Sequence, residues 1–176
     1  MTNKQTSILH FDDVCFSYGQ EEILHSVTFT VHEHSFIGIV GPNGGGKTTL
    51  LRLALGLEKP QRGTIQLLGK YPDITRKNVG YVMQHLQYDD TFPMTVLDLV
   101  LLGLAGKRMI GFFSIQDKEA AKNELKRVGL AGYENRSVAT LSGGQRQRAL
   151  VAQALIADPP VLFLDEPTAN IDSTGE

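Results

Sequence analysis

The stretch Gly41-Pro42-Asn43-Gly44-Gly45-Gly46-Lys47-Thr48 decides the fold of this 176-residue chain. It fits the pattern G-x-x-x-x-G-K-[ST], which requires a strand before it and the start of a helix after it. The apolar run 36–40 predicts that strand, and apolar residues recur at helical spacing from 50 to 57. Glycines let backbone N–H groups converge on phosphate oxygens, and a helix N-terminus adds partial positive charge. The order strand, loop, helix therefore predicts an α/β fold with a phosphate-binding loop.

Two side chains at the end of this loop have chemistry that suits a nucleotide. The Lys47 ammonium is expected to meet the β- and γ-phosphates, and the Thr48 hydroxyl to bind Mg²⁺. The alternative is a glycine-rich turn that binds nothing, which the flanking strand and helix disfavour. The motif by itself does not separate an ATPase from a GTPase, a kinase or a transporter subunit.

An acidic pair follows the apolar run 161–164 near the end of the chain. In a nucleotide site, Asp165 would hold Mg²⁺ through water and Glu166 would polarise the attacking water as a general base. Without a phosphate loop upstream, the same pair would be interpreted as solvated charges at a strand end. The loop at 41–48 favours the site.

The stretch Leu141-Ser142-Gly143-Gly144-Gln145 stands about 20 residues before the acidic pair. It opens a helix expected from about 146 to 157, which Ser142 can cap while the two glycines leave amide donors exposed. This predicts a second anion site. The alternative is a capped helix with a Gly-Gly entry turn.

Other segments predict the remaining elements. Strands are expected over 8–17, 23–32, 64–68 and 79–83, and the region from about 85 to 140 is expected to be helical. Thr95 and Ser114 each precede an acidic residue by three positions, which predicts capping boxes. Gly129 is the expected C-terminal stop of a helix over 118–128.

Taken in chain order, the phosphate loop, LSGGQ and the acidic strand resemble the ATP-binding subunit of an ATP-binding-cassette (ABC) transporter, over essentially the whole chain. The resemblance implies a P-loop NTPase of ABC ATPase type, with an N-terminal antiparallel β subdomain and an inserted helical subdomain. It implies one domain over 1–176, in which 1–84 and 146–176 form the nucleotide-binding core. Residues 85–145 would form the helical subdomain that includes the signature loop.

The resemblance further implies ATP and Mg²⁺ as cofactors, and a head-to-tail dimer in which LSGGQ closes over the γ-phosphate bound by the other subunit. Glu166 and Gln84 are the implied catalytic residues, and Mg²⁺ would be held by Thr48, Gln84 and Asp165. The implied nucleotide-binding residues are Tyr18, Gly41, Pro42, Asn43, Gly44, Gly45, Gly46, Lys47, Thr48, Thr49, Ser142, Gly143, Gly144, Gln145 and Asp172.

Three of these roles depend on the resemblance alone. Tyr18 would stack on adenine, Gln84 would sense Mg²⁺ and couple to the membrane subunits, and Asp172 would lie in a loop that crosses the dimer interface. A tyrosine before a glycine is otherwise a turn residue, and a glutamine after a strand is otherwise a solvated one.

The stretches 41–57 and 92–103 are most similar to subunits that drive zinc or manganese import. This implies integral membrane permease partners and a cytoplasmic location on the inner face of the membrane, held through the permease. The alternatives are a soluble ABC ATPase outside transport and a nucleotide-binding module without turnover. His32 and His34 share a strand face, but with no further ligands in view they are interpreted as solvated residues.

Composition limits the remaining classes. The chain has 41% hydrophobic residues and a net charge of −2, which suits a packed domain and gives no reason to expect nucleic acid as a partner. Cys15 is the single cysteine and is expected to be a small core or strand residue. The longest apolar run near the middle, 96–105, is far shorter than the roughly 20 residues that span a bilayer.

The resemblance is incomplete at the C-terminus. Members of the family continue with another strand and a histidine that contacts the γ-phosphate, whereas this chain ends at Glu176 and all its histidines lie at or before His85. That strand would lie between 36–40 and 161–164. We therefore expect a fragment, an early-terminated form, or another element in that position.

Overall fold

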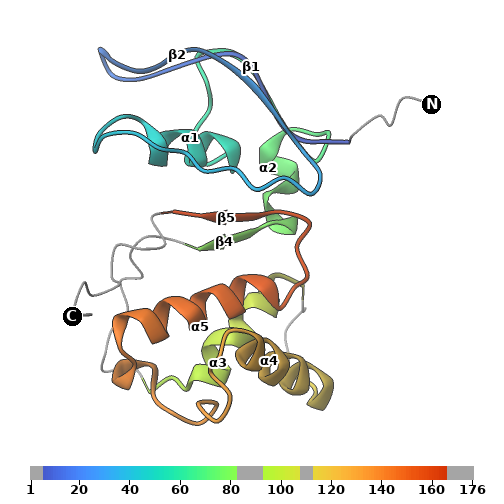
Figure 1. The fold of residues 1–176 in the computed structure, drawn as a ribbon. Coiled ribbons are helices and arrows are strands. Elements are labelled where there is room, and N and C mark those ends of the chain that lie inside the picture. Colours follow the sequence, from blue (N-terminus) through green and yellow to red (C-terminus); the bar gives the residue numbers. More distant parts are fainter. Residues whose placement is uncertain (1–5, 83–92, 108–112, 166–176) are drawn as a thin grey trace. The chain divides into compact units, whose positions relative to one another are not determined.

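The computed structural model describes residues 6–82, 93–107 and 113–165 (Figure 1). The chain divides into two compact units, Met1–Asn78 and Val79–Glu176. None of the described helices is long and apolar enough to cross a membrane. The predicted subdomain boundaries at residues 84 and 145 stay a prediction, because residue 84 lies outside the described residues.

Unit 1 is built on a three-stranded antiparallel sheet in the order β2-β1-β3, formed by β1 (Ser7–Tyr18), β2 (Glu21–His32) and β3 (Arg62–Leu67). The core face of β1 is apolar, since Leu9, Phe11, Val14 and Phe16 are buried. Helices α1 (Lys47–Ala54) and α2 (Pro72–Thr75) and a 3₁₀ turn (Arg76–Asn78) complete the unit. The strands expected over 8–17, 23–32 and 64–68 are confirmed.

The strand predicted over 36–40 is wrong. The structure gives this stretch no regular secondary structure, and no described strand pairs with it. Phe36 is 94% exposed and Val40 is 95% exposed. An apolar run signals a tendency to be buried, but a strand also needs a backbone partner at its edge.

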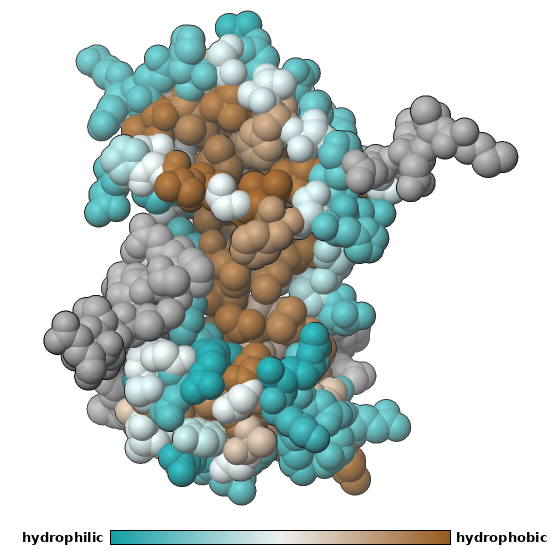
Figure 2. All heavy atoms as spheres, viewed as in Figure 1, coloured by the Kyte–Doolittle hydropathy of each residue, from teal (hydrophilic) through white to brown (hydrophobic). Residues whose placement is uncertain are grey.

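Apolar side chains also gather, in brown, on the visible face of the part that holds β1, β2 and α1 (Figure 2).

Unit 2 pairs two short parallel strands, β4 (Gly80–Val82) and β5 (Leu162–Leu164), with Tyr81 opposite Phe163. Its helices are α3 (Val96–Leu101), α4 (Ile115–Arg127) and α5 (Gly143–Leu155), with 3₁₀ helices over Leu102–Lys107 and Val138–Thr140. Helix α5 lies beside the strand pair, and α3 and α4 pack on α5 (Figure 1).

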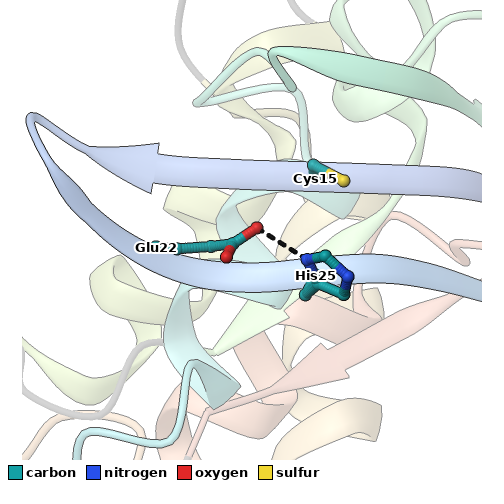
Figure 3. A group of neighbouring side chains, drawn as sticks. All are labelled: Cys15, Glu22 and His25. Atoms are coloured by element: carbon teal, nitrogen blue, oxygen red, sulfur yellow. Dashed lines mark hydrogen bonds and ion pairs between the residues drawn. The ribbon is translucent and has the colours of Figure 1, made fainter.

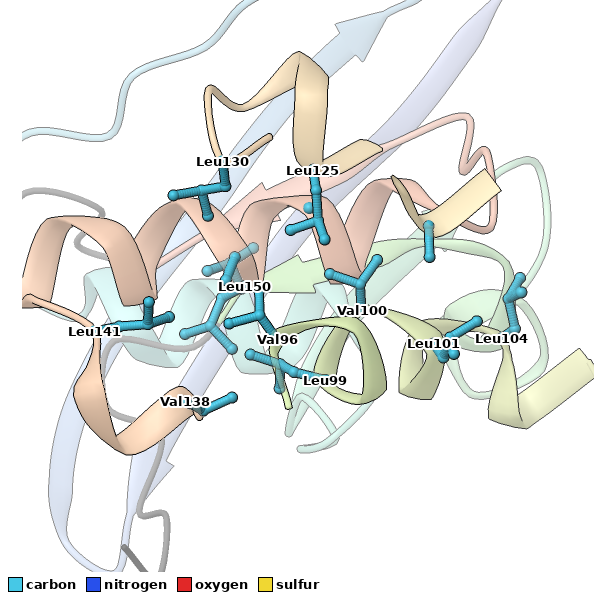
Figure 4. Packing of buried hydrophobic residues seen from close by; sticks show 14 residues of the cluster. Val96, Leu99, Val100, Leu101, Leu104, Leu125, Leu130, Val138, Leu141 and Leu150 are labelled. Carbon is cyan, nitrogen blue, oxygen red and sulfur yellow. The ribbon is translucent and has the colours of Figure 1, made fainter. Parts of the chain in front are cut away.

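One apolar cluster holds the helices of unit 2 together (Figure 4). Leu125 and Leu130 are fully buried and come from α4 and the turn after it, whereas Val96 and Val100 come from α3. Truncating one such leucine to alanine typically costs 2–5 kcal/mol. This cluster fixes the helix that begins at the LSGGQ stretch.

The helix boundaries in unit 2 follow the predicted caps. Thr95 and Ser114 both form capping boxes, with Asp98 and Asp117 as their respective partners. Gly129 follows α4 with φ of +72°, a conformation that favours glycine. The local signals for starting and ending these helices are therefore confirmed.

Candidate functional site

The phosphate loop at 41–48 connects unit 1's sheet to helix α1. Gly44 and Gly46 adopt φ of +79° and +81°, which residues with a Cβ rarely adopt. The Gly45 N–H donates to the Pro42 carbonyl at 3.1 Å, which closes a tight turn. Residues 41–45 are exposed, so the backbone of the loop is open to a ligand.

Gly46 fixes the loop against the hairpin formed by β1 and β2. A Cβ on Gly46 would lie 3.1 Å from Ile23 Cγ2 and 3.2 Å from Leu24 Cδ2, closer than most real Cβ contacts. The last glycine of the motif is therefore needed both for its backbone conformation and for this packing. The contact connects the phosphate loop to the strand that follows Tyr18.

The N-terminus of α1 suits an anion. Its N-cap, Gly46, supplies no side-chain hydrogen bond, and the first turn contains no acidic residue. Lys47 Nζ donates to the carbonyls of Gly41 at 3.0 Å and Pro42 at 2.8 Å, so the ammonium group lies over the loop. Thr48 is exposed in the first turn, whereas Thr49 is buried and faces the interior of the unit. The Lys47 ammonium and the helix dipole together favour a phosphate here.

Tyr18 lies at the end of β1, where it pairs with Glu21 across the hairpin turn. Its ring is 43% exposed and stands edge-on to Phe16, with 4.8 Å between ring centroids. Its hydroxyl donates to Glu58 Oε1 at 3.5 Å. An exposed aromatic side chain on the hairpin that contacts Gly46 is compatible with stacking on a nucleotide base.

The LSGGQ stretch forms the start of α5 in unit 2. The helix begins at Gly143, three residues earlier than expected, because Ser142 and Gln145 form a capping box. The Gln145 N–H donates to Ser142 Oγ at 3.3 Å, and the Ser142 N–H donates to Gln145 Oε1 at 3.0 Å. A Cβ on Gly144 would meet no atom of the described residues within 4 Å. Packing against that part of the chain therefore does not require glycine at 144.

Two residues that the sequence did not single out hold this stretch in place. Gln145 Nε2 donates to the Tyr133 hydroxyl at 3.3 Å, and the guanidinium of Arg136 lies 4.1 Å from the centre of the Tyr133 ring. Tyr133 thus fixes the far end of the Gln145 amide. No sequence pattern marks this contact, because Tyr133 lies 12 residues before Gln145 in an irregular segment.

The acidic strand ends at a buried carboxylate. Asp165 follows β5 and is only 5% exposed. Its N–H donates to the Val82 carbonyl at 3.0 Å, and the Tyr81 hydroxyl donates to its Oδ2 at 3.4 Å. The carboxylate is therefore held at the carboxyl ends of a parallel strand pair, where ligands of α/β proteins bind.

The structure thus describes part of the predicted site in each unit. Unit 1 contains Tyr18 and the phosphate loop, and unit 2 contains Asp165 and LSGGQ. Gln84, Glu166 and Asp172 lie outside the described residues.

Comparison with known proteins gives consistent matches. The family profile described as ABC transporter matches residues 24–169. A probable metal transport system ATP-binding protein of Chlamydia pneumoniae is 43% identical over 170 residues, covering 94% of this chain and 69% of the relative. The zinc uptake system ATP-binding protein ZurA of Listeria innocua is 40% identical, covering 94% of this chain and 66% of ZurA.

Among solved structures, a metal-chelate type ABC transporter in an inward-facing conformation matches with a TM-score of 0.82 and 30% identity. The match covers 94% of this chain and 62% of that one. The chain spans about two thirds of the length of these proteins.

Proposed function

The chain belongs to the ABC transporter family, and from that premise we propose that it is the ATP-hydrolysing subunit that powers a metal importer. The observation that carries the proposal is the phosphate loop, whose exposed residues 41–45 lead into an α1 N-terminus free of acidic residues. The family fold is α/β of P-loop type, with an antiparallel β unit and helices inserted between the strands of the second unit.

The residues of the two units fit Mg²⁺-ATP. The backbone N–H groups of the exposed residues Asn43 and Gly44 would bind the phosphates, and Lys47 would exchange its bonds to the Gly41 and Pro42 carbonyls for bonds to the β- and γ-phosphates. Thr48, Gln84 and the buried Asp165 would hold Mg²⁺, an ion that prefers oxygen ligands. Bound Mg²⁺ would neutralise the negative charge that develops on the γ-phosphate oxygens in the transition state. Tyr18 would stack on the adenine.

We assign the hydrolysis step to Glu166, the residue after Asp165 in the sequence. Glu166 would accept a proton from a water molecule as that water attacks the γ-phosphorus and the bond to the β-phosphate oxygen breaks. The products are ADP and inorganic phosphate. Asp165 itself would orient water around Mg²⁺ rather than take the proton.

A second subunit would complete the site. The N-terminus of α5, with Ser142, Gly143, Gly144 and Gln145, would serve as a second anion site. In a head-to-tail dimer it would contact the γ-phosphate held by the other subunit, and Asp172 would lie at the interface. ATP would then favour the closed dimer, and hydrolysis would release it.

The proposed cargo is a divalent metal ion, zinc or manganese, carried by permease subunits rather than by this chain. The names of the relatives support this choice. The protein would sit on the cytoplasmic face of the membrane through its permease. We further propose that 1–84 and 146–176 act as the nucleotide-binding core and 85–145 as the helical subdomain that includes the signature loop.

The test is ATP binding and ATP-dependent dimerisation of the purified protein. Lys47→Ala removes a charged hydrogen-bond donor, worth about 1.5–3 kcal/mol, so ATP affinity should fall about 10- to 150-fold. Lys59→Ala is the matched control, since Lys59 is exposed in the same unit and lies outside the loop. Equal ATP affinity in the two variants would refute the assignment of the loop.

Glu166→Gln should prevent hydrolysis while sparing ATP binding, and should therefore accumulate an ATP-dependent dimer on gel filtration. ATP binding without dimer or turnover would favour a nucleotide-binding module instead. The cargo can be tested in strains that lack their own zinc or manganese importer ATPase. Restored growth at limiting zinc or limiting manganese would identify the cargo. If the protein restores growth in neither strain, the metal cargo is rejected.

A further inference from the structure

We propose that the β1–β2 hairpin contains a zinc-class metal site formed by Cys15, Glu22 and His25. The three residues lie side by side in Figure 3, with Cys15 on one strand and the other two on its neighbour. Their ligand atoms, a thiol sulfur, a carboxylate oxygen and an imidazole nitrogen, all lie within 4.8 Å of one another. This site is separate from the proposed ATP site and does not depend on it.

Two irregularities in the strand pairing bring these residues to one face. Val14 pairs with Val27 and Phe16 with Leu24, so Cys15 alone lies opposite two residues, His25 and Ser26. That is the pattern of a β-bulge, which redirects a side chain at the cost of a ladder bond. A second register shift follows, because Phe16 pairs with Leu24 but Ser17 pairs with Glu22. Ile23 is therefore left without a partner on β1, and Glu22 lies opposite Ser17.

The bulges matter because simple alternation would separate the ligands. In a regular strand Glu22 would lie on the same face as Leu24, because the two residues are two positions apart. His25 would then lie on the opposite face from Glu22. Leu24 is buried in the core, whereas Glu22 and His25 are exposed. With the bulges, the core side keeps Val14, Phe16 and Leu24, and the opposite side presents the three candidate ligands.

The local hydrogen bonds already orient the donors. His25 Nδ1 lies 2.9 Å from Glu22 Oε1, and the Ser26 N–H donates to Cys15 Sγ at 3.3 Å. Ser26 adopts φ of +50°, so the backbone conformation at the bulge directs this N–H toward the sulfur.

The ligand types select the metal. Thiolate and imidazole are softer than the oxygen ligands that Mg²⁺ and Mn²⁺ prefer, and Zn²⁺ accepts all three donor types. Zn²⁺ sites with three protein ligands keep water in the fourth position, and bond lengths of about 2.0–2.3 Å place tetrahedral ligands roughly 3.5 Å apart. Atoms within 4.8 Å approach that spacing, and small rotations of the exposed Glu22 and His25 side chains would bring them to it.

Occupancy would cross-link β1 to β2 close to Tyr18, since Cys15 precedes Tyr18 by three residues on the same strand. The hairpin also packs on Gly46 of the phosphate loop. The site would therefore stiffen the hairpin that holds the expected adenine contact.

The test is titration of the reduced, purified protein with Zn²⁺ and with Co²⁺ as a spectroscopic probe. One equivalent of Zn²⁺ should bind, protect Cys15 from a thiol reagent, and compete with Co²⁺. Bound Co²⁺ should show a thiolate-to-cobalt charge-transfer band in the near ultraviolet. Mn²⁺ and Mg²⁺ at equal concentration should give no thiol protection.

The variants Cys15→Ser, Glu22→Gln and His25→Ala should each weaken Zn²⁺ binding by at least about tenfold. Loss of a residue that only hydrogen-bonds to a metal ligand already lowers metal affinity by about tenfold, and these variants remove a ligand itself. Cys15→Ser should also abolish the cobalt band. His10→Ala is the matched control, since His10 lies on the same hairpin and bonds to Thr30 rather than to the cluster. Circular dichroism checks that each variant is folded.

Two results would overturn the proposal. The first is Zn²⁺ binding that His10→Ala weakens as much as His25→Ala, which would indicate adsorption on exposed side chains. The second is unchanged thiol reactivity of Cys15 at saturating Zn²⁺.

Discussion

Replacing Gly103 by alanine should destabilise unit 2 by about 2 kcal/mol. Gly103 lies in the 3₁₀ helix over Leu102–Lys107, where this helix passes the backbone of α5. A Cβ on Gly103 would lie 2.0 Å from the Gln153 carbonyl oxygen and 2.6 Å from Ile156 Cγ2. Ordinary contact begins near 3.4 Å, so the backbones would have to separate by about 1.4 Å.

The magnitude follows from two opposing effects. Overpacking a tight core costs typically 1–3 kcal/mol, and the upper end applies because the obstacle is backbone rather than a rotatable side chain. Alanine gains roughly 0.5–1 kcal/mol over glycine by restricting the unfolded chain. The net loss is about 2 kcal/mol, which is about a 30-fold change in the unfolding equilibrium.

The assay is urea denaturation of the whole protein combined with native-state hydrogen exchange of α5. Amides of α5 should exchange about 30-fold faster in Gly103→Ala, whereas the β1–β2 hairpin in unit 1 should be unaffected. Gly106→Ala is the control from the same 3₁₀ helix, because a Cβ there would lie more than 4 Å from every atom in the part of the chain that the structure describes. It should be neutral or slightly stabilising. Equal stability of the two variants would show that the close approach of Gly103 to α5 is not tight in solution.

Three further outcomes are expected. Tyr133→Phe removes the acceptor of Gln145 Nε2, a bond worth about 1 kcal/mol, and should weaken ATP-dependent dimerisation by up to about fivefold; a dimer of unaltered affinity would contradict the positioning role. Ser114→Ala removes a capping box and should cost about 1 kcal/mol in urea melts, and no loss would show that the cap contributes little. The hydrogen bond and opposite charge of Glu119 raise the pKa of Lys122 above its ordinary 10.5. The small stabilisation of the folded state by this pair is therefore complete at neutral pH and is lost as the pH rises through the raised pKa. Glu119→Gln should lower the pKa of Lys122 in an NMR titration, and an unchanged pKa would contradict this cause.

The sequence was sufficient where the signal is local. The capping boxes at Thr95 and Ser114 and the stop at Gly129 are short-range patterns, and all three appear as predicted. The same holds for the helix that begins at Lys47, because the G-x-x-x-x-G-K-[ST] pattern with apolar residues at helical spacing after it predicts a helix N-terminus there.

Prediction failed where an element depends on a distant partner. The run 36–40 has the composition of a buried strand, yet it is irregular and exposed among the described residues. Side-chain composition reports a preference for burial, whereas strand formation depends on hydrogen bonds to another segment. The helix at LSGGQ started three residues earlier than predicted for a related reason, since the capping box extends it to Gly143.

By itself, the sequence determined the phosphate loop, the order of elements and the family, because these depend on residue types at fixed spacing. Only the tertiary structure decided that Tyr133 holds Gln145, that Gly103 lies against α5, and that Cys15 faces His25 across a bulge. Each of these contacts joins residues at least ten positions apart. Their geometry depends on strand register and helix packing, which the whole fold sets and no local pattern encodes.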